Sequence, residues 1–289
     1  MTGRLPVGTG TGKGTGASVP FVDSPVDPAA ALDFSGQTVL VTGGTRGLGR
    51  VVCRTFLDAG ADVVTCARSA PDEPVTSSDG SRHATFVAAD VRDADQVEAV
   101  VTAAVDQTGR LDVLVNNAGG APPADTSTAS MGFHEKVIAL NLTSALTFSR
   151  AAHGALADGD GGVILNISSV SGTRTNPGGA AYGAAKAGLA NLGRTLAHEW
   201  GPAIRVVTGT VGMIVTDEAA AFYGDGGRRE SIGGLLAAGR MGEPEDVADM
   251  CLVLASPLAR WVTGTEVEVH GGDERPGYLD AIGTDAESD

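Results

Sequence analysis

The stretch Thr42-Gly-Gly-Thr-Arg-Gly-Leu-Gly49 decides the fold of this chain. An apolar, β-rich run at 38–42 precedes it, and a run with helical periodicity follows it and ends near Gly60, a C-cap candidate. Glycines permit a tight turn and a close approach of backbone to pyrophosphate, and a helix N-terminus favours an anion. The spacing is Gly-x-x-x-Gly-x-Gly, so a tight connection without a ligand is the alternative. The strand before the turn and the helix after it favour nucleotide binding.

Strand and helix patterns alternate along the rest of the chain. Further apolar, β-rich runs lie at 62–67, 84–88, 111–115, 204–208 and 265–269, with helical periodicity between several of them. Such alternation implies right-handed crossovers and a parallel sheet. We therefore predict a single α/β domain with a Rossmann-like, doubly wound, seven-stranded parallel sheet flanked by helices. Ligands bind beyond the carboxyl ends of strands in such sheets, so the segments that follow the first four strands should meet at one rim.

The composition limits the kinds of partner. The chain has 289 residues, a net charge of −15 and three cysteines, which lie far apart in apolar surroundings without metal or disulfide spacing and are interpreted as core thiols. The charge argues against nucleic acid and anionic membranes as partners. No apolar run approaches the roughly 20 residues of a membrane span, and the first residues lack the layout of a signal peptide. We expect a cytoplasmic protein without a metal site.

The two ends differ in composition from the middle. Residues 1–34 are rich in Gly, Thr, Pro and Ala and predict a disordered leader. The glycines at 8–16 do not form a phosphate loop, because no Ser or Thr follows Lys13 and no strand precedes them. The catalytic domain is expected at 35–272, with a glycine-containing substrate lid at 215–242. Residues 273–289 form an acidic tail, expected to be mobile or to dock on a neighbouring subunit.

The residues after the second predicted strand indicate the type of nucleotide. NAD-binding folds place an acidic residue about 20 positions after the glycine turn, where it holds the ribose 2′-OH. Ala67 and Arg68 occupy that place here, and Arg46 lies inside the turn. Two cations and no carboxylate suit a 2′-phosphate, so we predict NADP(H) in preference to NAD(H). The alternative is that the arginines are only solvated.

Tyr182 and Lys186 form a candidate acid/base pair. They lie in an Ala-rich run at 180–200 with helical periodicity, and residues i and i+4 share a helix face. A free tyrosine has a pKa of about 10, and a nearby lysine cation favours the phenolate, so the pair suits proton transfer. On this spacing alone, an ordinary amphipathic helix is the alternative.

Three motifs, in this order and at these separations, resemble the single-domain short-chain dehydrogenase/reductase family: the glycine turn, Asn116-Asn-Ala-Gly119 and Tyr182-x-x-x-Lys186. The resemblance runs from about residue 36 to 272, is closest to 3-oxoacyl-carrier-protein reductase-like members, and implies a homo-oligomer, a tetramer or a dimer. It implies a catalytic set of Asn141, Ser169, Tyr182 and Lys186, with Ser168 and Ser171 as competing choices for the serine. The implied cofactor contacts are Gly43, Thr45, Arg46, Gly47, Leu48, Gly49, Arg68, Asp90, Val91, Asn116, Ala118, Gly119, Tyr182, Lys186, Gly212, Ile214 and Thr216.

The function implied by the resemblance is an NADPH-dependent carbonyl reductase or alcohol dehydrogenase that acts on a small-molecule ketone or alcohol. In such a mechanism Tyr182 protonates the carbonyl oxygen and Ser169 donates a hydrogen bond to it. Lys186 lowers the tyrosine pKa and helps to position the cofactor, and Asn141 holds a water that links Lys186 to solvent. The alternatives are oxidation of a secondary alcohol of steroid, sugar or polyketide type, and a non-catalytic NADP-binding regulatory protein.

One departure from the family pattern affects the nicotinamide side. The family usually has Asn-x-Val-x-Pro-Gly after the strand at 204–208, whereas Val207 and Val211 stand at the Asn and Pro positions here. Because the missing proline would fix φ near about −65°, the sequence leaves the shape of this loop open.

Overall fold

The computed structural model describes residues 26–159, 161–216, 223–224 and 226–278. Within this part of the chain, seven strands form one sheet in the order β3-β2-β1-β4-β5-β6-β7. Every neighbouring pair is parallel, which confirms the predicted Rossmann-like sheet. The strands are β1 (Thr38–Thr42), β2 (Asp62–Ala67), β3 (Thr85–Ala88), β4 (Val113–Asn116), β5 (Gly162–Ser169), β6 (Ile204–Val211) and β7 (Thr265–Val269).

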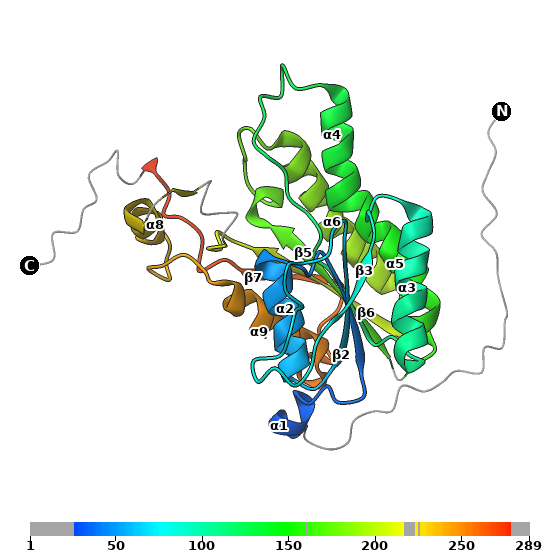
Figure 1. Ribbon diagram of the computed structural model, residues 1–289. Helices are drawn as coiled ribbons and strands as arrows, with labels where there is room; N and C mark the ends of the chain where they lie inside the picture. The colour runs from blue at the N-terminus through cyan, green and yellow to red at the C-terminus, as the bar shows by residue number, and fades with distance from the viewer. Residues whose placement is uncertain (1–25, 160, 217–222, 225, 279–289) are drawn as a thin grey trace, which may run out of the picture.

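Helices cover both faces of this sheet (Figure 1). Helices α2 and α9 pack on one face, and α3, α5 and α6 pack on the other. The α-helices are α1 (Pro28–Ala31), α2 (Gly47–Asp58), α3 (Ala94–Thr108), α4 (Met131–Ile138), α5 (Ser144–Ala157), α6 (Ala180–Trp200), α8 (Gly226–Gly233) and α9 (Pro244–Ala255). Shorter turns are the π-helical η1 (Ala139–Thr143) and the 3-10 turns η2 (Val170–Gly172) and η3 (Pro257–Ala259).

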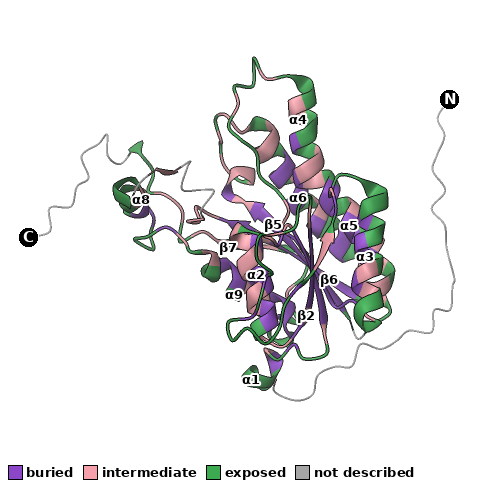
Figure 2. Ribbon diagram, viewed as in Figure 1, coloured by how far each residue is buried: buried purple, intermediate pink, exposed green. Residues whose placement is uncertain are grey.

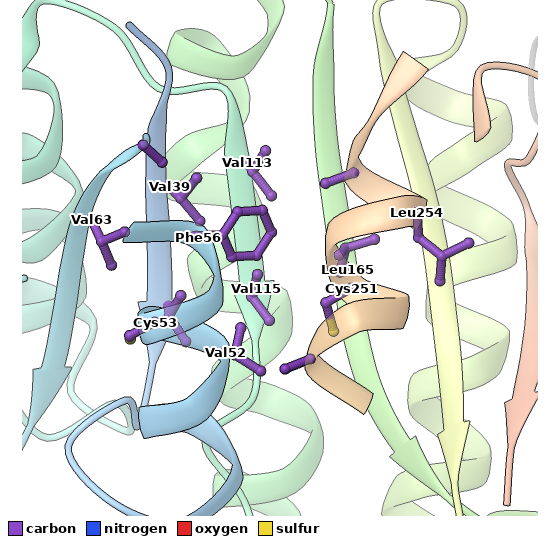
Figure 3. Packing of buried hydrophobic residues seen from close by; sticks show 14 of the residues in the cluster. Val39, Val52, Cys53, Phe56, Val63, Val113, Val115, Leu165, Cys251 and Leu254 are labelled. Carbon is purple, nitrogen blue, oxygen red and sulfur yellow. The ribbon is translucent and has the colours of Figure 1, made fainter. Parts of the chain in front are cut away.

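Two apolar clusters, one on each face, hold the helices to the sheet. The central strands are buried along their length (Figure 2), as expected for a parallel sheet covered on both sides. On the face shared by α2 and α9, the Phe56 ring lies among valines of β1 and β4 (Figure 3). The cysteines are buried, two of them in this cluster, so the interpretation as core thiols is confirmed.

Residues 27–34 adopt a defined structure, which the sequence does not predict. Helix α1 is capped by the Asp27 side chain, which accepts from Ala29 N. Phe34 is 1% exposed and meets the Phe56 ring edge-on, with ring centroids 5.2 Å apart. The predicted disordered leader through residue 34 is therefore too long, because Phe34 fills part of the core. Residues 1–25 lie outside the described residues.

The predicted acidic tail is also fixed at its start. Arg174 Nη1 lies 2.7 Å from Asp273 Oδ1 and also pairs with Glu274. These ion pairs hold Asp273 and Glu274 to the loop after β5, so the tail predicted at 273–289 starts with two residues that contact the domain. Residues 279–289 lie outside the described part of the chain.

Strand β6 continues through the position where the family pattern has proline. It runs to Val211, which pairs with Ser169 of β5 and Val269 of β7. Valine keeps the backbone N–H that proline lacks and leaves the strand free to continue. Gly212 N then donates to Val269 O at 3.0 Å, which fixes the start of the loop that the sequence left open.

Among the described helices, none combines the length and the apolar character that a bilayer crossing requires. The described residues also contain no cluster of three or more His, Cys, Asp or Glu side chains arranged to hold a metal ion.

Candidate active site

A cavity of about 800 Å³ lies beyond the carboxyl ends of the strands. The segments that follow β1, β2, β3 and β4 all line it, so the predicted rim exists. Asn116 and Asn141 do not line this cavity. The remaining predicted site residues do: Gly43, Thr45, Arg46, Gly47, Leu48, Gly49, Arg68, Asp90, Val91, Ala118, Gly119, Ser169, Tyr182, Lys186, Gly212, Ile214 and Thr216.

The glycine turn is built for close backbone approach. Gly43 has a φ of 69°, and Gly43 N donates to Cys66 O of β2 at 2.9 Å. A Cβ placed on Gly49 would lie 2.3 Å from Gly43 O and 2.4 Å from Asn117 Nδ2. The turn therefore closes only around glycine and leaves the N-terminus of α2 open toward the cavity. This cradle fits the pyrophosphate of a dinucleotide.

We predict that Gly49→Ala weakens dinucleotide binding at least tenfold, because the added methyl forces Gly43 and Asn117 apart at the start of α2. Fluorescence titration with NADPH measures this. Gly132→Ala in α4 is a matched control, since a Cβ there meets nothing within 4 Å. Equal affinities for the two variants would show that the turn does not hold the cofactor.

One end of the cavity is lined by charged side chains. Arg46 and Arg68 lie there, and both also line a neighbouring cavity of about 740 Å³. Asp90 is held by Arg92, with Nε to Oδ1 at 2.9 Å and Nη2 to Oδ2 at 2.5 Å. The hydrogen bonds from Arg92 lower the pKa of Asp90 to about 2, so its carboxylate is ionised at neutral pH. The sequence prediction missed Arg92, which fixes Asp90 against the cavity wall.

Asn116 lies within the sheet instead of in the cavity wall. It is 5% exposed, and its Nδ2 donates to Asn166 Oδ1 at 2.9 Å and to Ser149 Oγ at 3.2 Å. Its side chain ties β4 to β5 and α5, so the predicted cofactor contact at Asn116 is corrected to a structural role. The neighbouring Asn117 lines the cavity, and its Nδ2 donates to Thr42 O at 2.9 Å.

At the opposite end of the cavity, Ser169 and Tyr182 face each other. The side chains of Ser169 and Tyr182 are hydrogen-bonded to each other. Ser168, by contrast, is 4% exposed, and its hydroxyl donates to Lys186 O at 3.1 Å. Between these two serines, Ser169 is the one hydrogen-bonded to the tyrosine. Ser171 contributes its backbone N, which donates to Ser169 Oγ at 3.2 Å.

The direction of the tyrosine pKa differs from the one expected from the lysine alone. Burial raises the pKa of Tyr182, while the Ser169 hydrogen bond lowers it by less. Lys186 Nζ lies over the Tyr182 ring, 5.6 Å from its centroid. The expected net lowering is therefore not found, because burial outweighs the other causes. At neutral pH Tyr182 retains its proton, the form required of an acid.

Lys186 is buried at the base of the site. It is 4% exposed, and its Nζ donates to Ile167 O at 2.7 Å. Burial lowers the pKa of Lys186 to about 8, so the ammonium form still predominates at neutral pH. Helix α6 places it one turn after Tyr182, as the i and i+4 spacing predicts.

Asn141 lies behind the cavity wall in the π-helical turn η1. Its Nδ2 donates to Val137 O at 2.9 Å and to Gly120 O at 3.0 Å, and its Oδ1 accepts from Gly120 N at 2.7 Å. A Cβ placed on Gly119 would lie 2.8 Å from Asn141 Oδ1 and 3.2 Å from Lys186 Nζ. Asn141 Oδ1 and Lys186 Nζ thus both lie close to Gly119, and a side chain at this position would collide with them.

Tyr223 also lines the cavity. The sequence placed it in the substrate lid but gave it no role. Its spacing carries no motif, so only the three-dimensional arrangement reveals it. Residues 217–222 and 225 of the predicted lid lie outside the described residues.

Comparison with known proteins is consistent with this geometry. The family model described as "Enoyl-(Acyl carrier protein) reductase" matches residues 43–273. A 3-oxoacyl-[acyl-carrier-protein] reductase from Vibrio harveyi is 33% identical over 244 residues, covering 83% of this chain and 98% of that protein. An L-rhamnose 1-dehydrogenase (NAD(P)(+)) from Azotobacter vinelandii is 36% identical over 248 residues, covering 82% and 96%. Among solved structures, a 7α-hydroxysteroid dehydrogenase complexed with NADH and 7-oxo glycochenodeoxycholic acid superposes with a TM-score of 0.77 at 27% identity, covering 87% and 99%.

Proposed function

The chain belongs to the short-chain dehydrogenase/reductase family of NAD(P)-dependent oxidoreductases that act on CH–OH and C=O groups, and from this premise we propose that it is an NADPH-dependent reductase of small-molecule ketones. The observation that carries the proposal is the single cavity with a glycine cradle at one end and Ser169, Tyr182 and Lys186 at the other. A nucleotide held in the cradle and extended along this cavity would present its nicotinamide to the tyrosine. The relatives include a ketone reductase and a sugar dehydrogenase, so a carbonyl substrate is consistent with both.

The chain's own residues divide the chemistry between them. NADPH, when bound, supplies the hydride for the carbonyl carbon. Ser169 donates a hydrogen bond to the carbonyl oxygen, where negative charge develops. Tyr182 gives its proton to the same oxygen. Because burial raises the Tyr182 pKa, the phenol is protonated at neutral pH, the form that can donate to the carbonyl oxygen.

Lys186 and Asn141 support the proton transfer. The Lys186 ammonium over the Tyr182 ring stabilises the phenolate that remains after proton donation. Asn141 Oδ1 and Lys186 Nζ both lie close to Gly119, and a water bridging Asn141 and Lys186 would return the proton. Oxidation of a secondary alcohol is the same chemistry in reverse, with Tyr182 as the base, and the dehydrogenases among the relatives keep it as the second candidate.

The preference for NADPH rests on two arginines. Arg46 and Arg68 both lie where the cradle opens into the neighbouring cavity, and a 2′-phosphate there would meet two guanidinium groups. No carboxylate occupies the end of β2, where NAD-binding folds hold the 2′-OH.

We expect Arg68→Ala to weaken NADPH binding about 10- to 100-fold, since a hydrogen bond to a charged group contributes about 1.5–3 kcal/mol. NADH binding should remain nearly unchanged, because that nucleotide has no 2′-phosphate. Titration with each nucleotide provides the measurement. Arg54→Ala is the control, because Arg54 lies on the same helix α2 and pairs with Glu245 outside the cavity. Wild-type affinities that are equal for NADPH and NADH would refute the NADP preference.

The general experiment is a panel of ketones tested for NADPH oxidation. Thioester ketones, steroid ketones and sugar ketones should be compared directly, because the family relatives divide among these classes. Turnover of at least one class with NADPH supports the proposal. A protein that binds NADPH and reduces no ketone would fit the regulatory alternative instead.

A further inference from the structure

Two of the three tyrosines in the chain line the same cavity. Tyr182 belongs to the catalytic set, whereas Tyr223 comes from the segment before α8. The third, Tyr278, is 66% exposed and does not line the cavity. A phenol on the outer surface of a protein needs no special role, but a second phenol in the catalytic cavity does need one.

The environment of Tyr223 keeps its hydroxyl protonated. Burial raises the pKa of Tyr223, the nearby Tyr182 phenol raises it further, and Arg174 lowers it. Tyr223 therefore lies close enough to both Tyr182 and Arg174 for their charges to be felt, and a neutral phenol can both donate and accept a hydrogen bond. The backbone of the following residue, Gly224, is held by Arg229, whose Nε donates to Gly224 O at 3.1 Å.

Arg174 does not bring a net positive charge to this end of the cavity. Its guanidinium pairs with Asp273 and Glu274, which follow β7. Of the described residues that line the cavity, the charged ones are Arg46, Arg68, Asp90 and Arg92 at the glycine-cradle end, and Lys186 below Tyr182. The wall around Tyr182 and Tyr223 otherwise presents Ser169 and small or apolar residues such as Ala121 and Ile214. Such a wall suits an uncharged substrate.

From this arrangement we infer that Tyr223 is a substrate-binding residue whose hydroxyl bonds a second oxygen of the ketone. The substrate class is then uncharged ketones with a second oxygen, such as ketoesters and hydroxyketones. One phenol serves the reacting carbonyl, and the other holds the second oxygen and so fixes which way the ketone lies. The inference rests on the proposed ketone reduction at the same site.

The test compares Tyr223→Phe with wild type on two uncharged ketones of similar size, ethyl 3-oxobutanoate and 2-hexanone. The variant removes only the hydroxyl. We expect its KM for the ketoester to rise about three- to tenfold, as for the loss of one neutral hydrogen bond, with kcat nearly kept. The KM for 2-hexanone should change less than twofold, because that ketone has no second oxygen. Tyr278→Phe is the matched control and should leave both substrates unaffected.

Three outcomes would overturn the inference: equal losses for both ketones, an unchanged KM for the ketoester, or a wild-type preference for the 3-oxobutanoate anion over its ethyl ester. A separate binding experiment tests the inference independently of the proposed function. Calorimetric titration of the NADPH-loaded protein with ethyl 3-hydroxybutanoate, a pair that cannot exchange hydride, should show about three- to tenfold weaker binding for Tyr223→Phe. If wild type reduces no ketone, the proposed function fails, while this titration still decides whether Tyr223 binds the second oxygen.

Discussion

Replacing Tyr182 by phenylalanine is expected to lower kcat for ketone reduction by about 10³-fold or more, at the upper part of the range for removal of a general acid. The substitution removes the phenol that is hydrogen-bonded to Ser169, and with it the proton for the developing alkoxide. NADPH binding should remain within about twofold, because the glycine cradle and the arginines proposed to hold the nucleotide are unchanged. Single-turnover NADPH oxidation and a fluorescence titration measure the two quantities separately.

Tyr278→Phe controls for the loss of a phenol as such, since Tyr278 is exposed outside the cavity. If Tyr182→Phe retained most of its activity, the tyrosine would have no place in the mechanism. A parallel loss of NADPH affinity would point instead to a role in cofactor binding.

Replacing Lys186 by methionine is expected to lower kcat about 10²-fold or more while leaving the folded protein at least as stable near neutral pH. The ammonium is 4% exposed, and its removal deprives the phenolate of the cation that stabilises it. The fall of the Lys186 pKa from 10.5 to about 8 corresponds to roughly 3 kcal/mol of unfavourable burial of the charged form. Against this gain stands the loss of the hydrogen bond from Lys186 Nζ to Ile167 O, which costs about 1–3 kcal/mol.

The pH dependence of this stability difference has a definite sign. Below pH 8 the lysine is protonated in both the folded and the unfolded state, so the wild-type protein carries the full burial penalty. Between about pH 8 and pH 10.5 the folded protein loses the proton first, and wild type gains stability relative to the variant. Urea unfolding of both proteins at about pH 7 and about pH 10 measures the change. A difference that stays constant with pH would mean that the lysine is not buried as a cation.

Several features of the fold and the site were predictable because short stretches of sequence determine them. The glycine turn between a strand and a helix, the alternation of strands and helices, and the i and i+4 spacing of Tyr182 and Lys186 depend on residues close in sequence. Helix α6 accordingly begins and ends where the pattern indicates, at Ala180 and Trp200. The single rim also follows, because parallel strands present their carboxyl ends at one edge.

The predictions failed where distant residues decide the outcome. Phe34 follows a Gly- and Pro-rich stretch, and only its packing on Phe56 shows that it belongs to the core. Asn116 belongs to the recognised motif, but its hydrogen bonds to Ser149 and Asn166 hold its side chain within the sheet. The direction of the Tyr182 pKa depends on burial, which no spacing reveals. Tyr223 reaches the cavity from a segment without a recognisable motif.

The most direct test of the central claim is the fate of the hydride. The wild-type protein is given NADPH deuterated at the transferred C4 position and an α,β-unsaturated ketone, which offers both a carbonyl carbon and an alkene carbon to reduction. The product is analysed by mass spectrometry and deuterium NMR. With Tyr182 and Ser169 placed around the carbonyl oxygen, the deuterium is expected on the carbinol carbon of an allylic alcohol. Deuterium on the former alkene carbon of a saturated ketone would contradict the account.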